Sequence, residues 1–169
     1  MAIVGIITDL KSEHDIEELL LKNKALNKNN VIFIKEKNID NIKNVHFDTI
    51  VINRNFEKID KLNNILENAK NVIINMDSKI EDDDISIVDS NIITYGFNSK
   101  SSITISSVTD DDVLICVQRN IYNSYGEIEP QEVKLENNDN YSIYDLIIVL
   151  ALFLMYIPSF DEININGIK

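Results

Sequence analysis

The sequence predicts a single α/β domain with a mainly parallel sheet and a small antiparallel β extension. In the first half of the chain, short apolar runs alternate with segments of helical periodicity, which is typical of βαβ units. In the second half, apolar runs follow one another with only turn signals between them, as antiparallel strands do. The 169 residues contain no internal repeat and no Pro- or Gly-rich linker, so we expect one domain over residues 1–169.

The parallel part opens with one strand and one helix. Residues 2–8 (AIVGIIT) form an apolar run of the buried-strand type. Ser12, three residues before Asp15, predicts a capping box at the start of the helix. The apolar face of that helix comprises Ile16, Leu19, Leu20 and Ala25.

Three more apolar runs continue the alternation: residues 31–34 (VIFI), 49–52 (TIVI) and 72–74 (VII). Between the last two runs, apolar residues recur at helical spacing and predict a second helix: Ile59, Leu62, Ile65 and Leu66. Parallel strands connected by helices are covered on their faces, so this half of the chain predicts a Rossmann-like, three-layer arrangement.

The antiparallel extension is predicted from four further runs: residues 92–95, 102–108, 113–118 and 132–135. Only turn signals separate them, so we expect consecutive hairpins. Within the second run, Ile103 and Ile105 alternate with polar residues, which predicts one buried and one wet face.

The last predicted element is a strongly apolar helix. It begins near Ser142, with Asp145 as its capping-box partner, and continues through residues 146–157 (LIIVLALFLMYI) until Pro158. A membrane span needs about 20 apolar residues, so this shorter run predicts a buried core helix. Aromatic residues at both ends leave a membrane or interaction surface open as the alternative.

Composition excludes several classes of protein. Sixteen basic against 28 acidic residues give a net charge of -12, which repels phosphate backbones, so we expect no nucleic-acid partner. With two histidines and four glycines, the chain has no HExxH, GxGxxG or intact GxxxxGK[ST] motif. The single Cys116 cannot form an internal disulfide, and the N-terminus lacks the basic flank of a signal peptide, which favours a cytoplasmic protein.

Two acidic runs, residues 81–84 and 110–112, are candidates for calcium binding. Neither has the Asp-x-Asp-x-Asp-Gly loop with a distal Glu that such a site uses. We therefore predict solvated turns that keep the protein soluble, and no metal site.

Several segments, taken in order, resemble the central domain of the Mur ligases, the ATP-dependent enzymes that add amino acids to peptidoglycan precursors. Residues 72–78 (VIINMDS) resemble the family's strand that ends in Asn-x-Asp-Asp, and residues 92–99 (IITYGFNS) resemble the strand and Gly turn that open its small antiparallel sheet. Residues 141–145 (YSIYD) occupy the positions of its His-Asn-x-x-Asn pattern, and residues 47–59 are similar to the strand that leads to its Asp-His-Leu. The resemblance spans roughly residues 2–157.

The chain departs from this family where phosphate and magnesium should bind. Residues 4–12 (VGIITDLKS) stand where the family has its Gly-rich phosphate loop, and Lys11 and Ser12 resemble the closing Lys-Ser/Thr pair, but neither loop glycine is present. A Cβ at such positions obstructs the close approach of a phosphate. Lys58 replaces the His of Asp-His-Leu and would repel a divalent cation.

The resemblance implies a vestigial nucleotide site and no catalytic residues. Its cofactor-binding candidates are Thr8, Lys11, Ser12, Asn75 and Asp77. Asn75 and Asp77 follow a predicted parallel strand, where α/β folds place ligands, but turn chemistry explains them as well. A helix cap with a solvated lysine likewise explains Lys11 and Ser12. We expect no bound cofactor, with ATP and magnesium as the alternative.

The leading functional hypothesis is a non-catalytic Mur-ligase-like domain, a binding or scaffolding module in bacterial cell-envelope or peptidoglycan metabolism. Its partner would be an unidentified protein or a second copy of the chain. One alternative is the ATP-binding part of an ATP-dependent amino-acid ligase completed by a partner subunit. Another is a structural protein that interacts through its apolar C-terminal helix.

Overall fold

The computed structural model describes residues 2–23, 30–78, 85–137, 140–156 and 158. Its strands run β1 (Val4–Ile7), β2 (Val31–Phe33), β3 (Thr49–Ile52), β4 (Asn71–Asn75), β5 (Asn91–Gly96), β6 (Ile103–Val108), β7 (Asp112–Val117), β8 (Ile121–Asn123), β9 (Gly126–Ile128) and β10 (Gln131–Glu136). Its helices run α1 (Leu10–Asn23), α2 (Ile59–Leu66) and α3 (Ile143–Tyr156), with a short 3₁₀ helix at Ile39–Asn41.

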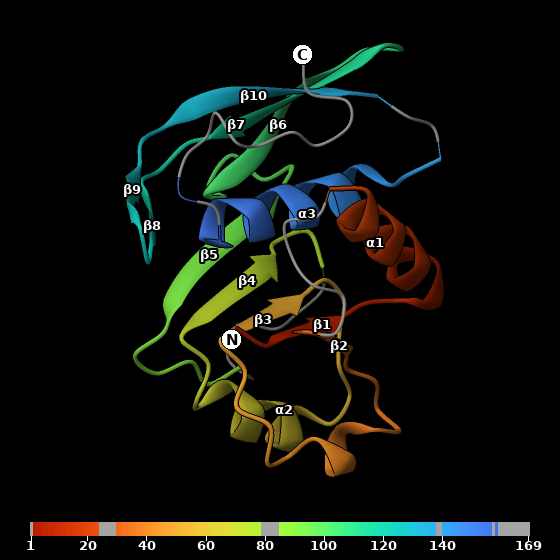
Figure 1. The fold of residues 1–169 in the computed structure, drawn as a ribbon, viewed down its shortest axis with the longest axis vertical. Helices are drawn as coiled ribbons and strands as arrows, with labels where there is room; N and C mark the ends of the chain where they lie inside the picture. The colour runs from red at the N-terminus through yellow and green to blue at the C-terminus, as the bar shows by residue number, and fades with distance from the viewer. Residues whose placement is uncertain (1, 24–29, 79–84, 138–139, 157, 159–169) are drawn as a thin grey trace.

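One eight-stranded sheet organises the domain, in the order β10-β7-β6-β5-β4-β3-β1-β2 (Figure 1). The strands from β2 across to β6 are parallel to one another, and β7 pairs antiparallel with both β6 and β10. The hairpin β8–β9 forms a separate two-stranded sheet. The predicted α/β class, with a mainly parallel sheet and a smaller antiparallel part, is confirmed.

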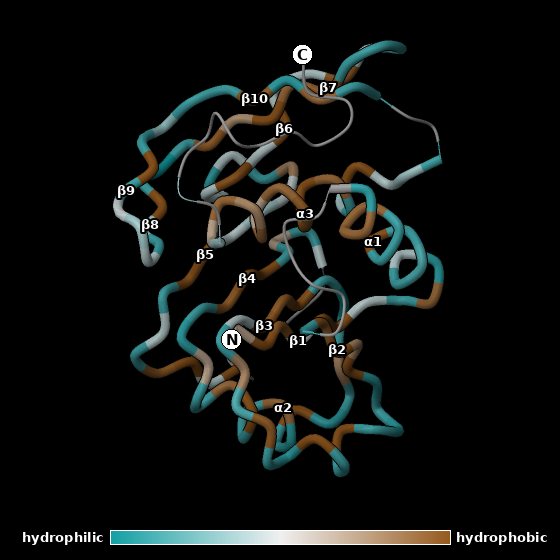
Figure 2. The backbone as a smooth tube through the Cα atoms, in the orientation of Figure 1, coloured by the Kyte–Doolittle hydropathy of each residue, from teal (hydrophilic) through white to brown (hydrophobic). Residues whose placement is uncertain are grey.

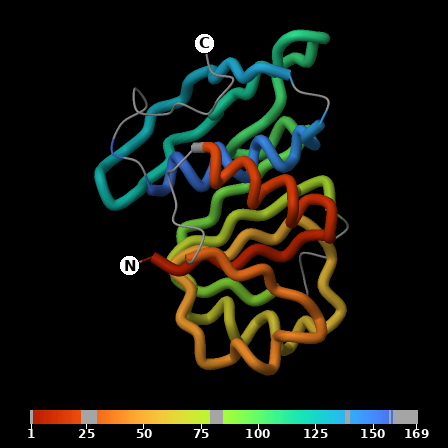
Figure 3. Tube along the Cα trace, turned by 45° about the vertical axis from the view of Figure 1, so that its right-hand side comes forward, coloured from red at the N-terminus to blue at the C-terminus, as the bar shows by residue number. Residues whose placement is uncertain are grey.

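Helices cover both faces of the parallel strands. Helices α1 and α3 lie side by side on one face, and α2 lies on the other (Figures 1 and 3). Side chains alternate between the two faces, as the period of two in a strand requires. On β1, Val4 and Ile6 join the core beside α1 and α3, whereas Ile7 joins the core beside α2.

Helix α3 is enclosed by the domain itself. The end of the sheet formed by β6, β7 and β10 lies over α3, on the side away from β1, β3 and β4 (Figure 1). Every residue of α3 from Asp145 to Met155 is buried, and the apolar character of most of the helix is visible in Figure 2. The predicted buried core helix is confirmed, and no helix among the described residues has the length and apolarity that a membrane span requires.

In the second half, one prediction was wrong and one hairpin was missed. Strand β5 was expected in an antiparallel hairpin, but it is parallel to β4 and its short pairing with β6 is also parallel. The reason is the connection between β5 and β6. In this turn Ser101 donates its N–H to Asn98 O, and the chain leaves the turn in the direction of β5 instead of the opposite direction. The hairpin β8–β9 was not predicted.

Other expectations have mixed outcomes. The antiparallel pairs β6–β7 and β7–β10 are confirmed, and Asp110 and Asp111 lie in the exposed turn between β6 and β7. Strand β1 is shorter than predicted because Thr8 already belongs to the turn into α1. Ala25 and residues 81–84 lie outside the described residues.

Candidate functional site

A polar pocket lies where the parallel strands end. The carboxyl ends of β1, β3 and β4 meet there with the N-termini of α1 and α3, and the pocket has a volume of about 390 Å³. Ligands of open α/β sheets bind outside this edge, which makes the pocket the candidate site. Its lining includes Asp9, Ser12, Asn53, Asn75, Asp77 and Tyr144.

An asparagine just past β3 connects three elements of the site. Asn53 donates its Nδ2–H to Thr8 Oγ1 (3.0 Å), and its Oδ1 accepts hydrogen bonds from Asn75 Nδ2 (3.0 Å) and Tyr95 OH (2.7 Å). Tyr95 is fully buried, and its burial, together with the charges of Asp145 and Asp77, raises its pKa well above the usual value. Tyr95 therefore stays protonated and holds the Asn53 amide in place.

The Asp77 carboxylate ties the ends of β4, β5 and α3 together. Its Oδ2 accepts hydrogen bonds from the Phe97 backbone N–H (2.6 Å) and from Tyr144 OH (3.0 Å). Partial burial, followed by the hydrogen bond to Asp77, raises the pKa of Tyr144 to about 12. The Tyr144 ring packs edge-on against Phe97, with centroids 5.8 Å apart. These contacts fix one wall of the pocket.

The connection between β1 and α1 consists of Thr8 and Asp9 alone. The Oδ1 atom of Asp9 accepts the backbone N–H groups of Lys11 (2.9 Å) and Ser12 (3.0 Å), so Asp9 is the N-cap of α1. The prediction of Ser12 as the cap was wrong, because Ser12 lies inside the first turn. Asp9 is among the strongest N-cap residue types, and this was the signal in the sequence.

The structure brings together most of the predicted site residues. Ser12, Asn75 and Asp77 line the pocket, and Thr8 lies behind Asn53. Thr8 also lines an adjoining, more apolar pocket of about 320 Å³. Lys11 lines neither pocket: its side chain is 76% exposed, with its Nζ 4.0 Å from Asp15 Oδ2.

The sequence predicts Asp145 as a capping-box partner and as the last position of the His-Asn-x-x-Asn pattern, but not its burial: its carboxyl group is completely buried beside the site. Neither carboxylate oxygen has a hydrogen-bond partner of good geometry among the described residues. Burial, reinforced by the charges of Asp15 and Asp9, raises the pKa of Asp145 to about 6, and the nearby Ser12 hydroxyl and Ser142 backbone oppose this rise. Ser142 caps α3 as predicted, its Oγ accepting the Tyr144 N–H (3.2 Å).

The charges around the pocket do not suit the phosphates of ATP. Asp9 and Asp77 line it, Asp145 lies close behind, and Arg54 is the one basic residue among the described lining residues. The N–H groups at the start of a helix can bind a phosphate, but here those of Lys11 and Ser12 already donate hydrogen bonds to Asp9 Oδ1. In the described part of the chain, no group of three or more His, Cys, Asp or Glu side chains could hold a metal ion.

Comparison with models of known protein families and with curated proteins gives no match for this chain. The resemblance to the Mur ligases therefore stays a prediction from the sequence segments alone. In the fold, three of those segments are joined at Asp77, which lines the pocket. Asp77 follows β4 and accepts hydrogen bonds from the Phe97 N–H, just after β5, and from Tyr144 OH at the start of α3.

Proposed function

We propose that the chain is a Mur-ligase-like domain without ligase catalysis, which acts as a binding or scaffolding module in bacterial cell-envelope or peptidoglycan metabolism. The observation that carries this proposal is the Asp9 cap at the N-terminus of α1. The cap lies where a related ATP-dependent enzyme would cradle phosphate.

Phosphoryl transfer depends on backbone N–H groups and cations that neutralise the phosphate charge in the transition state. Here a carboxylate accepts two of the N–H groups at the start of α1 and adds a negative charge of its own. The connection of two residues is too short to wrap around a phosphate. Among the described residues, positive φ angles occur only at Asp89, Gly96 and Gly126. The connection between β1 and α1 therefore also lacks the positive φ angles that the glycines of a phosphate loop adopt.

The pocket nevertheless keeps the features of a binding site. The amides of Asn53 and Asn75 are held by hydrogen bonds at the ends of β3 and β4. The adjoining pocket adds apolar surface from Ile7, Ile34 and Phe56. Rigid polar groups beside an apolar pocket favour recognition of a small molecule or a peptide segment over chemistry on a nucleotide.

Isothermal titration with ATP and magnesium, combined with an assay for phosphate release, tests the proposal. We expect neither saturable heat at millimolar ATP nor phosphate release. Saturable ATP binding with turnover would contradict the proposal. Binding without turnover would favour the alternative, in which the chain is the ATP-binding part of a ligase that a partner subunit completes.

A further inference from the structure

A third cavity, of about 590 Å³, lies at the opposite edge of the sheet, where the parallel strands begin. Its lining includes Asp48, Asn71 and Asn91 from the strand starts, Tyr156 from the end of α3, and Tyr122 and Tyr125 from the hairpin β8–β9. The volume is in the range of small-molecule sites, roughly 300–1,000 Å³. The cavity plays no part in the site at the carboxyl edge.

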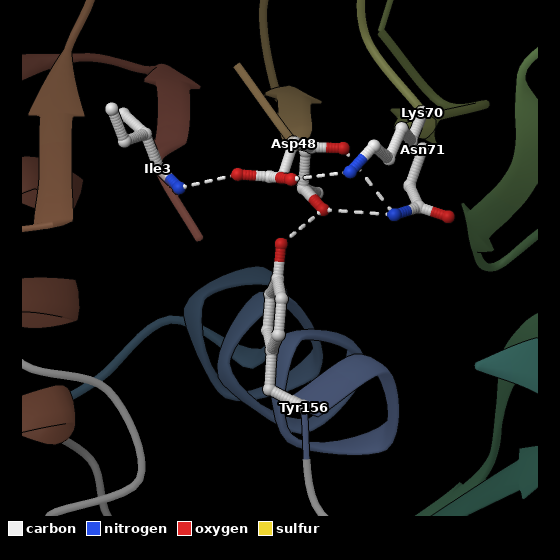
Figure 4. Close-up of polar contacts among 6 residues, drawn as sticks. Ile3, Asp48, Lys70, Asn71 and Tyr156 are labelled. Carbon is white, nitrogen blue, oxygen red and sulfur yellow. Dashed lines mark hydrogen bonds and ion pairs between the residues drawn. The ribbon is translucent and has the colours of Figure 1, made fainter. Parts of the chain in front are cut away.

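The floor of this cavity is a hydrogen-bonded group of residues that carries one acidic and one basic side chain (Figure 4). Asp48 accepts a hydrogen bond from the Ile3 N–H (2.8 Å) and forms an ion pair with Lys70 (3.0 Å). Beside them, the hydroxyl groups of Thr49 and Tyr156 lie 2.5 Å apart, which ties the end of α3 to the start of β3. Lys70, whose side chain is 78% exposed, is the one basic residue among the described lining residues, and its charge is balanced by Asp48.

The rim is a hairpin held in a fixed position. Asn123 Oδ1 accepts the backbone N–H groups of Tyr125 (2.8 Å) and Gly126 (3.0 Å), and Asn123 Nδ2 donates to Leu154 O on α3 (2.6 Å). Asn91 Nδ2 donates to Tyr122 O (3.1 Å), which attaches the hairpin to β5. The two tyrosines are therefore presented at the cavity by an ordered scaffold.

Both tyrosines are unusually exposed for aromatic residues. Tyr122 is 57% and Tyr125 60% exposed, although large aromatic side chains are normally well buried. Exposed rings at a cavity provide flat apolar area at a low cost in side-chain entropy. Beside them, Asn71 Nδ2 donates to Asp48 O and Thr49 Oγ1, and Asn91 Nδ2 donates to Asn71 Oδ1 and Tyr122 O. These amides therefore offer a ligand hydroxyl an accepting oxygen, Asn91 Oδ1, and not a donor.

From these observations we infer that the cavity binds a neutral saccharide. The rings of Tyr122 and Tyr125 contact the apolar face of a sugar, and the side-chain oxygen of Asn91 accepts a hydrogen bond from one of its hydroxyl groups. The balanced floor favours an uncharged ligand over a nucleotide or a phosphosugar. This inference is independent of the proposed function, because it concerns the other edge of the sheet.

Titration of the ¹⁵N-labelled protein with cellobiose and with chitobiose, followed by NMR, tests the inference. We expect saturable shifts of the backbone amides of Asn91, Tyr122 and Tyr125 with at least one of the two, at a Kd on the order of millimolar. Tyr125→Ala should weaken binding by about tenfold, and Tyr125→Phe, which keeps the ring face, should stay within about threefold. Phe97→Ala, an exposed aromatic at the opposite edge, should leave the Kd unchanged.

Three outcomes would overturn the inference. The first is the absence of saturable shifts with both disaccharides at about 50 mM, well above a millimolar Kd. The second is an unchanged Kd in Tyr125→Ala, with a thermal midpoint showing that this variant is folded. The third is binding of adenosine at these residues when neither disaccharide binds, which would identify a nucleobase site.

Discussion

At the scale of single residues, two carboxylates determine the character of the carboxyl edge. Asp9 accepts two N–H groups that the first turn of a helix otherwise leaves open to a ligand. Asp145 is buried close behind, without a good hydrogen-bond partner among the described residues. One carboxylate stabilises the fold by capping a helix, and the other destabilises it when charged. Their effects on stability can therefore be separated.

Replacing Asp9 with Ala should lower the free energy of unfolding by about 1 kcal/mol, because it removes the N-cap of α1. Urea denaturation measures this change. Asp110→Ala is the matched control: it removes the same charge from an exposed turn between β6 and β7 and should change stability by less than about 0.5 kcal/mol. Equal effects of the two substitutions would mean that the cap contributes nothing.

Asp145 should make stability depend on pH. Its pKa is about 6 in the folded protein against an ordinary 3.8, so the folded state holds the proton more tightly than the unfolded state. The contribution of Asp145 to the free energy of unfolding is fully present below about pH 4, and it is lost as the pH rises through about 6. At about 1.4 kcal/mol per pH unit, the full loss is roughly 2–3 kcal/mol.

Asp145→Asn should therefore raise the free energy of unfolding at pH 7 by roughly 2 kcal/mol and flatten its pH dependence between about 4 and 6. Urea denaturation at pH 4.5, 5.5 and 7 provides the measurement. Asp110→Asn, the same substitution in an exposed turn, is the matched control. If Asp145→Asn changed the pH dependence no more than this control does, the carboxyl group would not be titrating in this range.

At the scale of elements, the site depends on how strand ends are joined. The connection after β5 begins at Gly96, which has a φ of +140°. A Cβ built on Gly96 would lie 2.5 Å from Asp77 Oδ2, the atom that accepts hydrogen bonds from Phe97 and Tyr144. The close approach of β5 to Asp77 therefore requires glycine at this position.

Gly96→Ala should destabilise the protein by more than about 2 kcal/mol, since it combines an unfavourable φ with a steric clash. Gly126→Ala is a close control, because Gly126 has a φ of +146° but no atom within 4 Å of an added Cβ. Strain alone should cost about 1 kcal/mol there. Thermal and urea denaturation compare the two, and equal losses would argue against the packing of Asp77 on β5.

Local patterns in the sequence predict most elements and several of their pairings, but not all. The strands β1 to β4 and the helix α3 follow from apolar runs with clear boundaries. The parallel pairing of β5 with β6 could not be predicted, because it depends on turn geometry between them and not on either strand's own pattern. The hairpin β8–β9 has strands of only three residues, too short for a recognisable alternation.

At the scale of the whole molecule, the topology gathers residues from distant parts of the chain at each edge of the sheet. Asn75 and Asp77 could be predicted for the carboxyl edge, because parallel strands end on the same side. The sequence could not predict the roles of Asn53, Tyr95 and Asp145 there. These roles depend on contacts between segments about 40 or more residues apart. The same topology creates the tyrosine-lined cavity at the opposite edge.

Thermal unfolding with and without millimolar ATP and magnesium tests the central claim most directly, because a ligand that binds only the folded state raises the midpoint by mass action. We predict the same midpoint in both conditions, for the wild type and for Lys11→Ala alike, because Asp9 already caps the start of α1. A rise of several degrees that Lys11→Ala abolishes would contradict the account and show that a phosphate site survives.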